Sequence, residues 1–206
     1  MSSRPYFETV KSFADVPITI NGVETLVFLE ASEGLVQLFD LLGSGVFGFV
    51  QSDIKGNIGE RLLICLGVRA QYQTDSLHCS TLENLLISER SSQDRPGTGC
   101  LIRLTRGLTF LCRALQHMQN DPSMELHVCF KRSYDEVLRH HHTFFVRSLA
   151  AVAVRAAPYR RDFYTRISQG APVEKLDEEL ARWLSGLDVI VKRLKEFIEG
   201  EGYGRI

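Results

Sequence analysis

Hydrophobic residues recur at a spacing of three and four along most of this chain, which is the period of an amphipathic helix. The clearest stripe consists of Leu101, Leu104, Leu108, Leu111 and Leu115. Such a stripe marks the face of a helix that packs against other elements. The same pattern returns often enough to predict an all-α protein of about eight helices.

The boundaries of these helices follow from where the pattern begins and where Gly, Pro or polar residues interrupt it. One helix should contain Asp53 and Asn57 and continue over 57–66. The others are expected over 25–42, 81–88, 100–118, 124–138, 141–156, 161–167 and 173–198. The helix over 81–88 should begin at Ser80 or Thr81, with Glu83 as a capping partner. Residues 91–99, which include Pro96, are expected to form a loop.

Only one passage departs from the helical pattern. Asn21 and Gly22 lie between β-branched residues, which is a hairpin signal. An isolated two-stranded hairpin is marginally stable, so we interpret the passage as a turn. The chain then divides into a mostly irregular segment over 1–24 and a single domain over 25–206.

Composition indicates an ordinary globular protein, with 206 residues, 44% hydrophobic, 24% charged and a formal net charge of −1. This charge gives no reason to expect nucleic acid as a partner. Five scattered cysteines without a CxxC pair favour reduced thiols over a disulfide framework or a zinc site. No secretory signal or stretch of about 20 apolar residues is visible, so we expect a cytoplasmic protein.

Asp53 and Asn57 stand four residues apart directly after an apolar run. On a helix this spacing puts both on one face, where a carboxylate and a carboxamide could bind a polyhydroxyl group. The same residues could equally be a helix start with a solvated Asn57, because Ser52 and Asp53 are good N-cap residues. The window alone leaves both readings open.

The run His140, His141 and His142 does not predict a metal site, because consecutive helical residues point about 100° apart. His142 is the one expected to face inward, on a stripe with Phe145 and Leu149. It could bind a ligand there or be a satisfied core residue.

Arg103 and Arg106 lie three apart and could form a cationic fork for a phosphate or carboxylate. Alternatively, one extends to solvent while the other pairs with an acid such as Asp53. No nucleophile elbow, phosphate-binding loop or dinucleotide fingerprint accompanies them, so we expect neither an enzyme nor a cofactor.

Several segments, in order, resemble the signatures of the glycolipid transfer protein family. They are residues 39–47 (FDLLGSGVF) with 53–58 (DIKGNI), Arg106-Gly107-Leu108, His142 followed by residues 156–163 (AAPYRRDF), and Asp188-Val189-Ile190 with Tyr203. The resemblance implies a two-layer α-helical sandwich that carries one sphingolipid between membranes, as a monomer that touches membranes transiently.

The same resemblance assigns roles to particular residues. The head group and ceramide amide should be bound by Asp53, Asn57, Arg103, His142 and Tyr203. An apolar sleeve for the lipid chains should be lined by Phe39, Val46, Phe47, Val50, Phe145, Leu149 and Phe163, although core packing accounts for each equally well. Cations and aromatic rings suit a membrane interface, so Tyr159, Arg160 and Arg161 are expected to dock there.

Two positions depart from the glycolipid signature. Arg103 stands where that branch has a sugar-stacking tryptophan, and Glu60 stands where it has a lysine. An arginine at the first position resembles the ceramide-1-phosphate branch, but that branch has a lysine at Asn57 and a further arginine at Gly99. We therefore expect a glycosphingolipid slightly ahead of ceramide-1-phosphate, with a sphingolipid sensor that binds without shuttling as a further alternative.

Overall fold

The computed structural model describes residues 3–42, 48–58 and 67–206, and for Leu42, Phe49, Val50, Asp53 and Ile54 it describes the backbone only. Within these ranges the regular elements are helices apart from one small hairpin, which confirms the all-α prediction. The elements are α1 (Tyr6–Thr9), η1 (Phe13–Asp15), β1 (Ile18–Thr19), β2 (Gly22–Val23), α2 (Thr25–Leu42), α3 (Gly48–Ile58), α4 (Val68–Thr74), α5 (Leu82–Ser88), α6 (Pro96–Asn120), α7 (Leu126–Val137), η2 (Arg139–His141), α8 (Phe144–Arg155), α9 (Arg160–Ser168) and α10 (Val173–Gly200).

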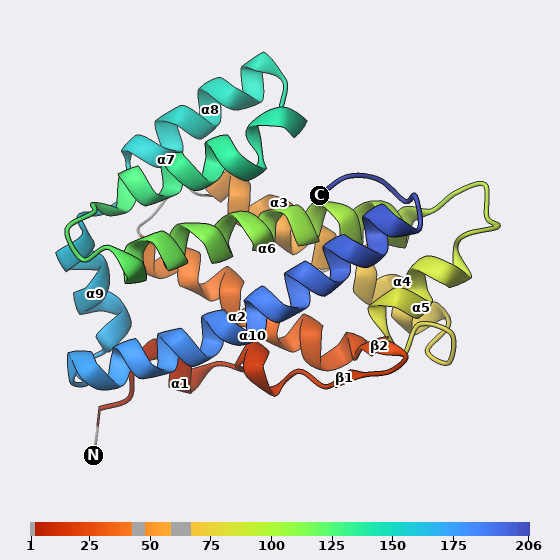
Figure 1. Cartoon of the computed structure of the whole chain (residues 1–206), viewed down its shortest axis with the longest axis horizontal. Coiled ribbons are helices and arrows are strands. Elements are labelled where there is room, and N and C mark those ends of the chain that lie inside the picture. Colours follow the sequence, from red (N-terminus) through yellow and green to blue (C-terminus); the bar gives the residue numbers. More distant parts are fainter. Residues whose placement is uncertain (1–2, 43–47, 59–66) are drawn as a thin grey trace.

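The helices form two layers around α6 (Figure 1). In this view α7 packs against α6 from above and α10 from below, and α2 and α3 lie behind these helices. α8 packs on α7, away from the centre of the molecule. α9 closes one end, where it contacts α1, α2 and α10. This arrangement leaves α8 with much less cover than the other long helices.

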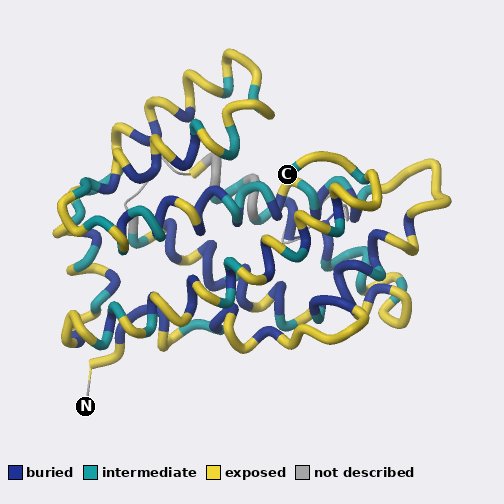
Figure 2. The backbone as a smooth tube through the Cα atoms, viewed as in Figure 1, coloured by how far each residue is buried: buried dark blue, intermediate teal, exposed yellow. Residues whose placement is uncertain are grey.

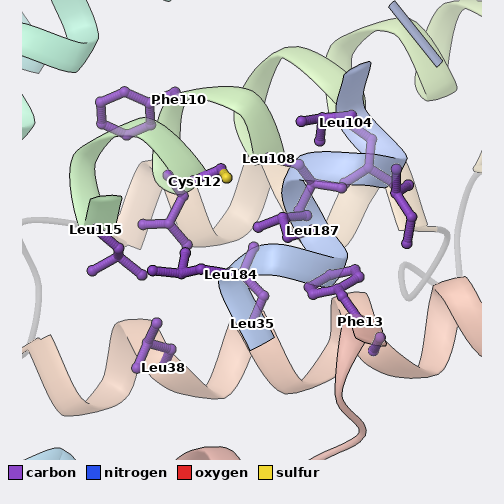
Figure 3. Close-up of a cluster of buried hydrophobic side chains, with 14 of the residues drawn as sticks. Phe13, Leu35, Leu38, Leu104, Leu108, Phe110, Cys112, Leu115, Leu184 and Leu187 are labelled. Carbon is purple, nitrogen blue, oxygen red and sulfur yellow. The ribbon is translucent and has the colours of Figure 1, made fainter. Parts of the chain in front are cut away.

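The core lies between α6, α10 and α2, as Figure 2 shows by the dark stripes that these helices turn toward one another. All five leucines of the predicted stripe on α6 are fully buried. In Figure 3, Leu104 and Leu108 of α6 face Leu184 and Leu187 of α10, with Leu35 of α2 beneath them. The helical period therefore predicted the buried face correctly.

The passage around Asn21 forms a hairpin, so its interpretation as a simple turn was wrong. β1 and β2 pair in antiparallel register, with Ile18 opposite Val23. The hairpin is not isolated, because the Glu83 carboxylate accepts a hydrogen bond from the Val23 N–H at 2.8 Å and the Thr81 hydroxyl donates to the Asn21 carbonyl. Tertiary contacts to α5 thus supply the stability that two strands alone lack.

α6 begins at Pro96, four residues earlier than predicted, inside the segment expected to be a loop. Proline is well suited to the first position of a helix, where no N–H is needed. The next N–H groups, of Gly97 and Thr98, donate to the buried Glu89 carboxylate at 2.9 and 2.6 Å. Because this cap comes from the end of α5, the sequence directly before Pro96 contains no cap residue that would predict the start of α6.

The helix after the histidine run starts later than predicted, and His142 is not part of it. His142 has extended backbone geometry between η2 and α8, and Thr143 caps α8 by accepting from the Val146 N–H. The expected stripe of His142 with Phe145 and Leu149 on one helix is therefore wrong. Similarly, Thr81 caps α5 as expected, but Glu83 contacts the hairpin rather than the cap.

Residues 3–24 pack closely against the rest of the described chain. Phe7 and Phe13 are each 1% exposed and both contact the ring of Trp183 in α10. A Cβ at Gly186 would lie 2.2 Å from the Ala14 nitrogen, so glycine allows η1 to touch α10. This segment is part of the core.

Among the helices described, none is long and apolar enough to span a bilayer.

Candidate functional site

Asn57 is buried at the end of α3, with 4% of its surface exposed. Its Oδ1 accepts a hydrogen bond from Nε of Arg103 on α6 at 3.0 Å. Asp53 lies one turn earlier in α3, so the backbone puts both positions on one face, but the side chain of Asp53 is outside the described part. Asn57 is thus a buried residue that joins two layers rather than a solvated one.

Arg103 is an exposed residue, yet two nitrogens of its guanidinium are hydrogen-bonded. Besides the bond to Asn57, its Nη2 donates to the Cys100 sulfur at 3.3 Å. The guanidinium plane is therefore oriented by two neutral groups. Because guanidinium binds phosphate and other oxygen-rich groups bidentately, this orientation suits a head group.

Arg106 points to a different partner, so the two arginines do not form the simple fork expected from their spacing. Its Nε donates to the Arg205 carbonyl at 2.9 Å, and its Nη2 donates to the same oxygen. Burial lowers the pKa of Arg106, and the nearby charge of Arg103 lowers it further. The C-terminal residues thus fold back over α6, as Figure 1 shows.

Tyr203 lies in this returning segment. Its ring stacks on Phe197, with the ring centroids 6.2 Å apart, and Arg90 lies 5.9 Å from its centroid. Its hydroxyl is buried and has no hydrogen-bond partner within the described ranges. A buried hydroxyl normally finds a partner, so this one is suited to receive a ligand.

His142 is held from two sides. Its Nδ1 lies 3.1 Å from the hydroxyl of Tyr134, a residue of α7 that is 8% exposed. Arg147 donates from Nε to the His142 carbonyl at 3.0 Å and to the Arg139 carbonyl at 3.1 Å, which fixes the turn. Sequence reasoning missed Tyr134, because eight residues and a change of element separate it from His142.

The charge of Arg106 reaches the histidine turn. The pKa of His141 is lowered, first by partial burial and then by the charge of Arg106, with smaller contributions from His142 and His140. The candidate residues come from α3, α6, the turn before α8 and the C-terminal segment. The hydrogen bonds among them and their neighbours join Asn57 to Arg103, Arg106 to Arg205, and His142 to Tyr134.

The residues expected to line an apolar sleeve divide into two groups. Phe39 and Phe163 are buried in the core, at 3% and 0% exposure. Phe145 and Leu149 instead lie on an open face of α8, at 71% and 42% exposure. Val46 and Phe47 lie outside the described residues, as does the side chain of Val50.

Of the residues expected to dock on a membrane, Tyr159 is 72% exposed and Arg161 is also exposed. Arg160 is different, because its guanidinium donates to the Met118 and Asp121 carbonyls and to the Tyr164 hydroxyl. Its guanidinium also lies 4.7 Å from the centroid of the Tyr164 ring. Arg160 therefore anchors α9 to the α6–α7 turn. Its guanidinium does not face outward with Tyr159 and Arg161.

A groove of about 480 Å³ runs between α7 and α8. Its lining includes four basic side chains and two aromatic rings: Lys131, Arg139, Arg147, Arg155, Tyr134 and Phe144. The Phe144 ring is 85% exposed. Asp135 pairs with Lys131 and Arg139, so the basic character is strongest at the other two arginines.

Four of the five cysteines are described, and one of them, Cys100, contacts Arg103. Cys79, Cys100, Cys112 and Cys129 are buried, reduced thiols, and Cys65 is outside the described residues. Across the ranges that the structure describes, no three His, Cys, Asp or Glu side chains come together as a metal site would require.

Comparison with known proteins agrees with the fold. The family model described as Glycolipid transfer protein (GLTP) matches residues 23–169. A glycolipid transfer protein of Aureobasidium melanogenum is 36% identical over 194 residues, which cover 94% of this chain and 92% of that protein. A glycolipid transfer protein of Danio rerio is 34% identical over 168 residues, covering 76% of each.

Solved structures give the same result. The crystal structure of HET-C2, a fungal glycolipid transfer protein, superposes with a TM-score of 0.86 at 37% identity and covers 94% of this chain and 96% of its own. Human ceramide-1-phosphate transfer protein in complex with 12:0 ceramide-1-phosphate has a TM-score of 0.81 at 19% identity, covering 96% and 97%, and so shares the fold. From its sequence and its two-layer helical fold, this chain belongs to the glycolipid transfer protein family.

Proposed function

We propose that this protein transfers a sphingolipid, foremost a glycosphingolipid, between membranes. The observation that supports the proposal is the contact of buried Asn57 with Arg103, which orients an amide and a guanidinium between α3 and α6. The relatives that are at least 34% identical are named glycolipid transfer proteins, which supports this lipid class.

In this proposal Asp53 and Asn57 bind head-group hydroxyls, Asp53 also accepts from the ceramide amide, and His142 donates to the ceramide carbonyl. Arg103 and Tyr203 contribute further hydrogen bonds to the head group. An imidazole whose Nδ1 accepts from Tyr134 carries its proton on Nε2, which is the form that donates to a carbonyl. The site would thus recognise the polar part of ceramide as well as its head group.

The lipid chains would contact the exposed apolar face of α8. Phe145, Leu149 and Val152 recur at helical spacing and are 71%, 42% and 63% exposed. Each CH₂ group that leaves water for an apolar surface is stabilised by about 0.8 kcal/mol. A protein that covers both chains therefore removes the largest barrier to crossing the aqueous phase, and it does so without chemical change.

We also propose that α8 and the start of α9 meet an anionic membrane. Arg155, Tyr159 and Arg161 lie outward at this corner, and Phe144 projects from the groove beside α8. Basic residues near an anionic bilayer each contribute about 1 kcal/mol of attraction, and aromatic rings prefer the interface. Arg160 is excluded from this surface because its guanidinium is bound internally.

The test is vesicle-to-vesicle transfer of galactosylceramide, lactosylceramide and ceramide-1-phosphate side by side. We expect His142→Leu to abolish transfer and His127→Leu, at an exposed position on α7, to leave it intact. Arg161→Glu should slow transfer from anionic vesicles, whereas Arg113→Glu should not. If all three lipids stay in the donor vesicles, the proposed function is wrong.

The same assay separates the alternatives. Stronger transfer of ceramide-1-phosphate than of either glycolipid would reverse the order of head groups. Binding without transfer would indicate a sphingolipid sensor, and a chemically altered lipid after incubation would indicate an enzyme. We propose a monomer in the cytoplasm that touches membranes transiently, which light scattering and cell fractionation would test.

A further inference from the structure

The guanidinium of Arg103 is the most accessible charge at the head-group site, and its partners are neutral. Nε donates to the Asn57 amide oxygen at 3.0 Å, and Nη2 donates to the Cys100 sulfur at 3.3 Å. A thiol is a weak acceptor. No carboxylate of the described residues lies within ion-pair distance of Arg103. An anionic oxygen would therefore be a much better partner than the thiol.

A second positive charge lies close to the first. The charge of Arg103 contributes to the lowered pKa of Arg106, after burial as the main cause. Two guanidinium groups that repel each other are both stabilised by a single anion placed near them. Nε and Nη2 of Arg106 already donate to the Arg205 carbonyl. Arg103 is therefore the arginine whose N–H groups would donate to the anion.

The chain has no indole on which a sugar ring could stack at this site. Its single tryptophan, Trp183, is 1% exposed and lies between Phe7 and Phe13, at 5.2 and 5.0 Å from their centroids. Hydroxyl recognition must then come from hydrogen bonding, for which the carboxamide of Asn57 is suited. The site thus combines a donor for an anion with an amide for hydroxyl groups.

We propose that the site also takes a ceramide joined through a phosphodiester to a polyol such as inositol. Arg103 binds the phosphodiester oxygens, and the α3 face that carries Asn57 binds the polyol hydroxyls. A phosphodiester carries one negative charge, which matches one accessible guanidinium, whereas a phosphomonoester carries between 1.5 and 2 at neutral pH. This inference rests on the proposed sphingolipid transfer.

The experiment compares four lipids in separate phosphatidylcholine vesicles: inositol phosphoceramide, galactosylceramide, ceramide-1-phosphate and phosphatidylinositol. Mass spectrometry of the acceptor vesicles measures each transfer rate. We expect inositol phosphoceramide to move at least as fast as galactosylceramide and about tenfold faster than ceramide-1-phosphate. Phosphatidylinositol shares the head group but lacks the ceramide amide, and we expect it to stay in the donor.

Arg103→Gln gives the residue-level test. We expect it to slow inositol phosphoceramide by about tenfold, the effect of one charge-assisted hydrogen bond, and galactosylceramide by less than threefold. Arg113→Gln, on the same helix but away from the site, is the matched control and should change neither rate. Circular dichroism melting confirms that both variants fold.

The outcomes distinguish this inference from the proposed function. If galactosylceramide moves and inositol phosphoceramide does not, this inference alone is wrong. Equal slowing of both lipids by Arg103→Gln would also overturn it, because the arginine would then have no preference for the phosphodiester. If no sphingolipid moves in any combination, the proposed function fails and this inference fails with it.

Discussion

The hydroxyl of Tyr134 lies 3.1 Å from Nδ1 of His142, and their ring centroids are 5.6 Å apart. Burial raises the pKa of Tyr134, so this hydroxyl keeps its proton throughout the physiological range. In our proposal the phenol donates to Nδ1, which leaves the imidazole proton on Nε2. Tyr134, which touches no lipid in that proposal, would then set the tautomer of His142.

Removing this hydroxyl is the first prediction. Tyr134→Phe keeps the ring and its packing but loses the contact to His142, so both imidazole tautomers become accessible. We expect transfer of galactosylceramide to fall by about two- to tenfold, the range of one net hydrogen bond. The thermal midpoint serves as a control for packing. An unchanged transfer rate would show that the tautomer of His142 does not matter.

The second prediction concerns Arg103, which the resemblance to the glycolipid signature puts at the position of a stacking tryptophan. Its guanidinium base touches Asn57, so a new side chain there would border the head group. We expect Arg103→Trp to raise galactosylceramide transfer severalfold, because ring stacking contributes about 1 kcal/mol. Arg103→Leu removes the charge without adding an indole, and it should not raise the rate. Equal gains in both variants would attribute the effect to charge alone.

The third prediction is a pH dependence of stability from His141. Its pKa is lowered in the folded protein from the ordinary value of 6.5, by burial first and the charge of Arg106 second. The unfolded chain therefore binds this proton more readily, and stability decreases as the pH falls from 6.5 through the lower folded value. His141→Gln should flatten the urea midpoint between pH 7 and pH 5.

The carboxyl groups with shifted pKa values act in a different pH window. Asp75 and Asp121 have pKa values below 3.8, owing mainly to hydrogen bonds with His78 and Ser123, so their contribution is lost only in stronger acid. If His141→Gln still loses stability between pH 7 and pH 5 as steeply as the unchanged protein does, the pH dependence belongs to another histidine.

The fourth prediction tests the hairpin contact with α5. Gly22 has a φ of +136°, and a Cβ there would lie 2.1 Å from the Glu83 carboxylate oxygen. We expect Gly22→Ala to lower the free energy of unfolding by about 2 kcal/mol, because it strains the backbone and displaces Glu83 from Val23 and Arg193. Gly200→Ala, where nothing lies within 4 Å, should be neutral or stabilising. Similar denaturant midpoints for the two variants would contradict this reading.

The helical period alone identified the fold class and most of the long helices. α2 begins and ends where the pattern predicted, and the leucines of α6 are buried as expected. These features are local, since a helix needs an apolar face and a stop signal within its own segment. The start of α6 was missed because its cap, Glu89, belongs to the preceding helix.

At the candidate site, too, the sequence identified residues but not their contacts with distant parts of the chain. The sequence selected Asn57, Arg103 and His142, because residue type and order carry a family resemblance. It did not show that Asn57 is buried against Arg103, that Tyr134 holds His142, or that Arg160 is bound internally. Each of these depends on which distant side chain comes within 3.5 Å, and spacing along one helix contains no such information.

By itself, then, the sequence of this protein determined its helices, their buried faces and the residue types available for binding. Tertiary structure decided which of those residues meet. The physical reason is that helical periodicity is set within a few turns by local geometry and apolar burial. Hydrogen bonds such as that between Arg103 and Asn57 form only after two layers have packed and brought their polar ends together.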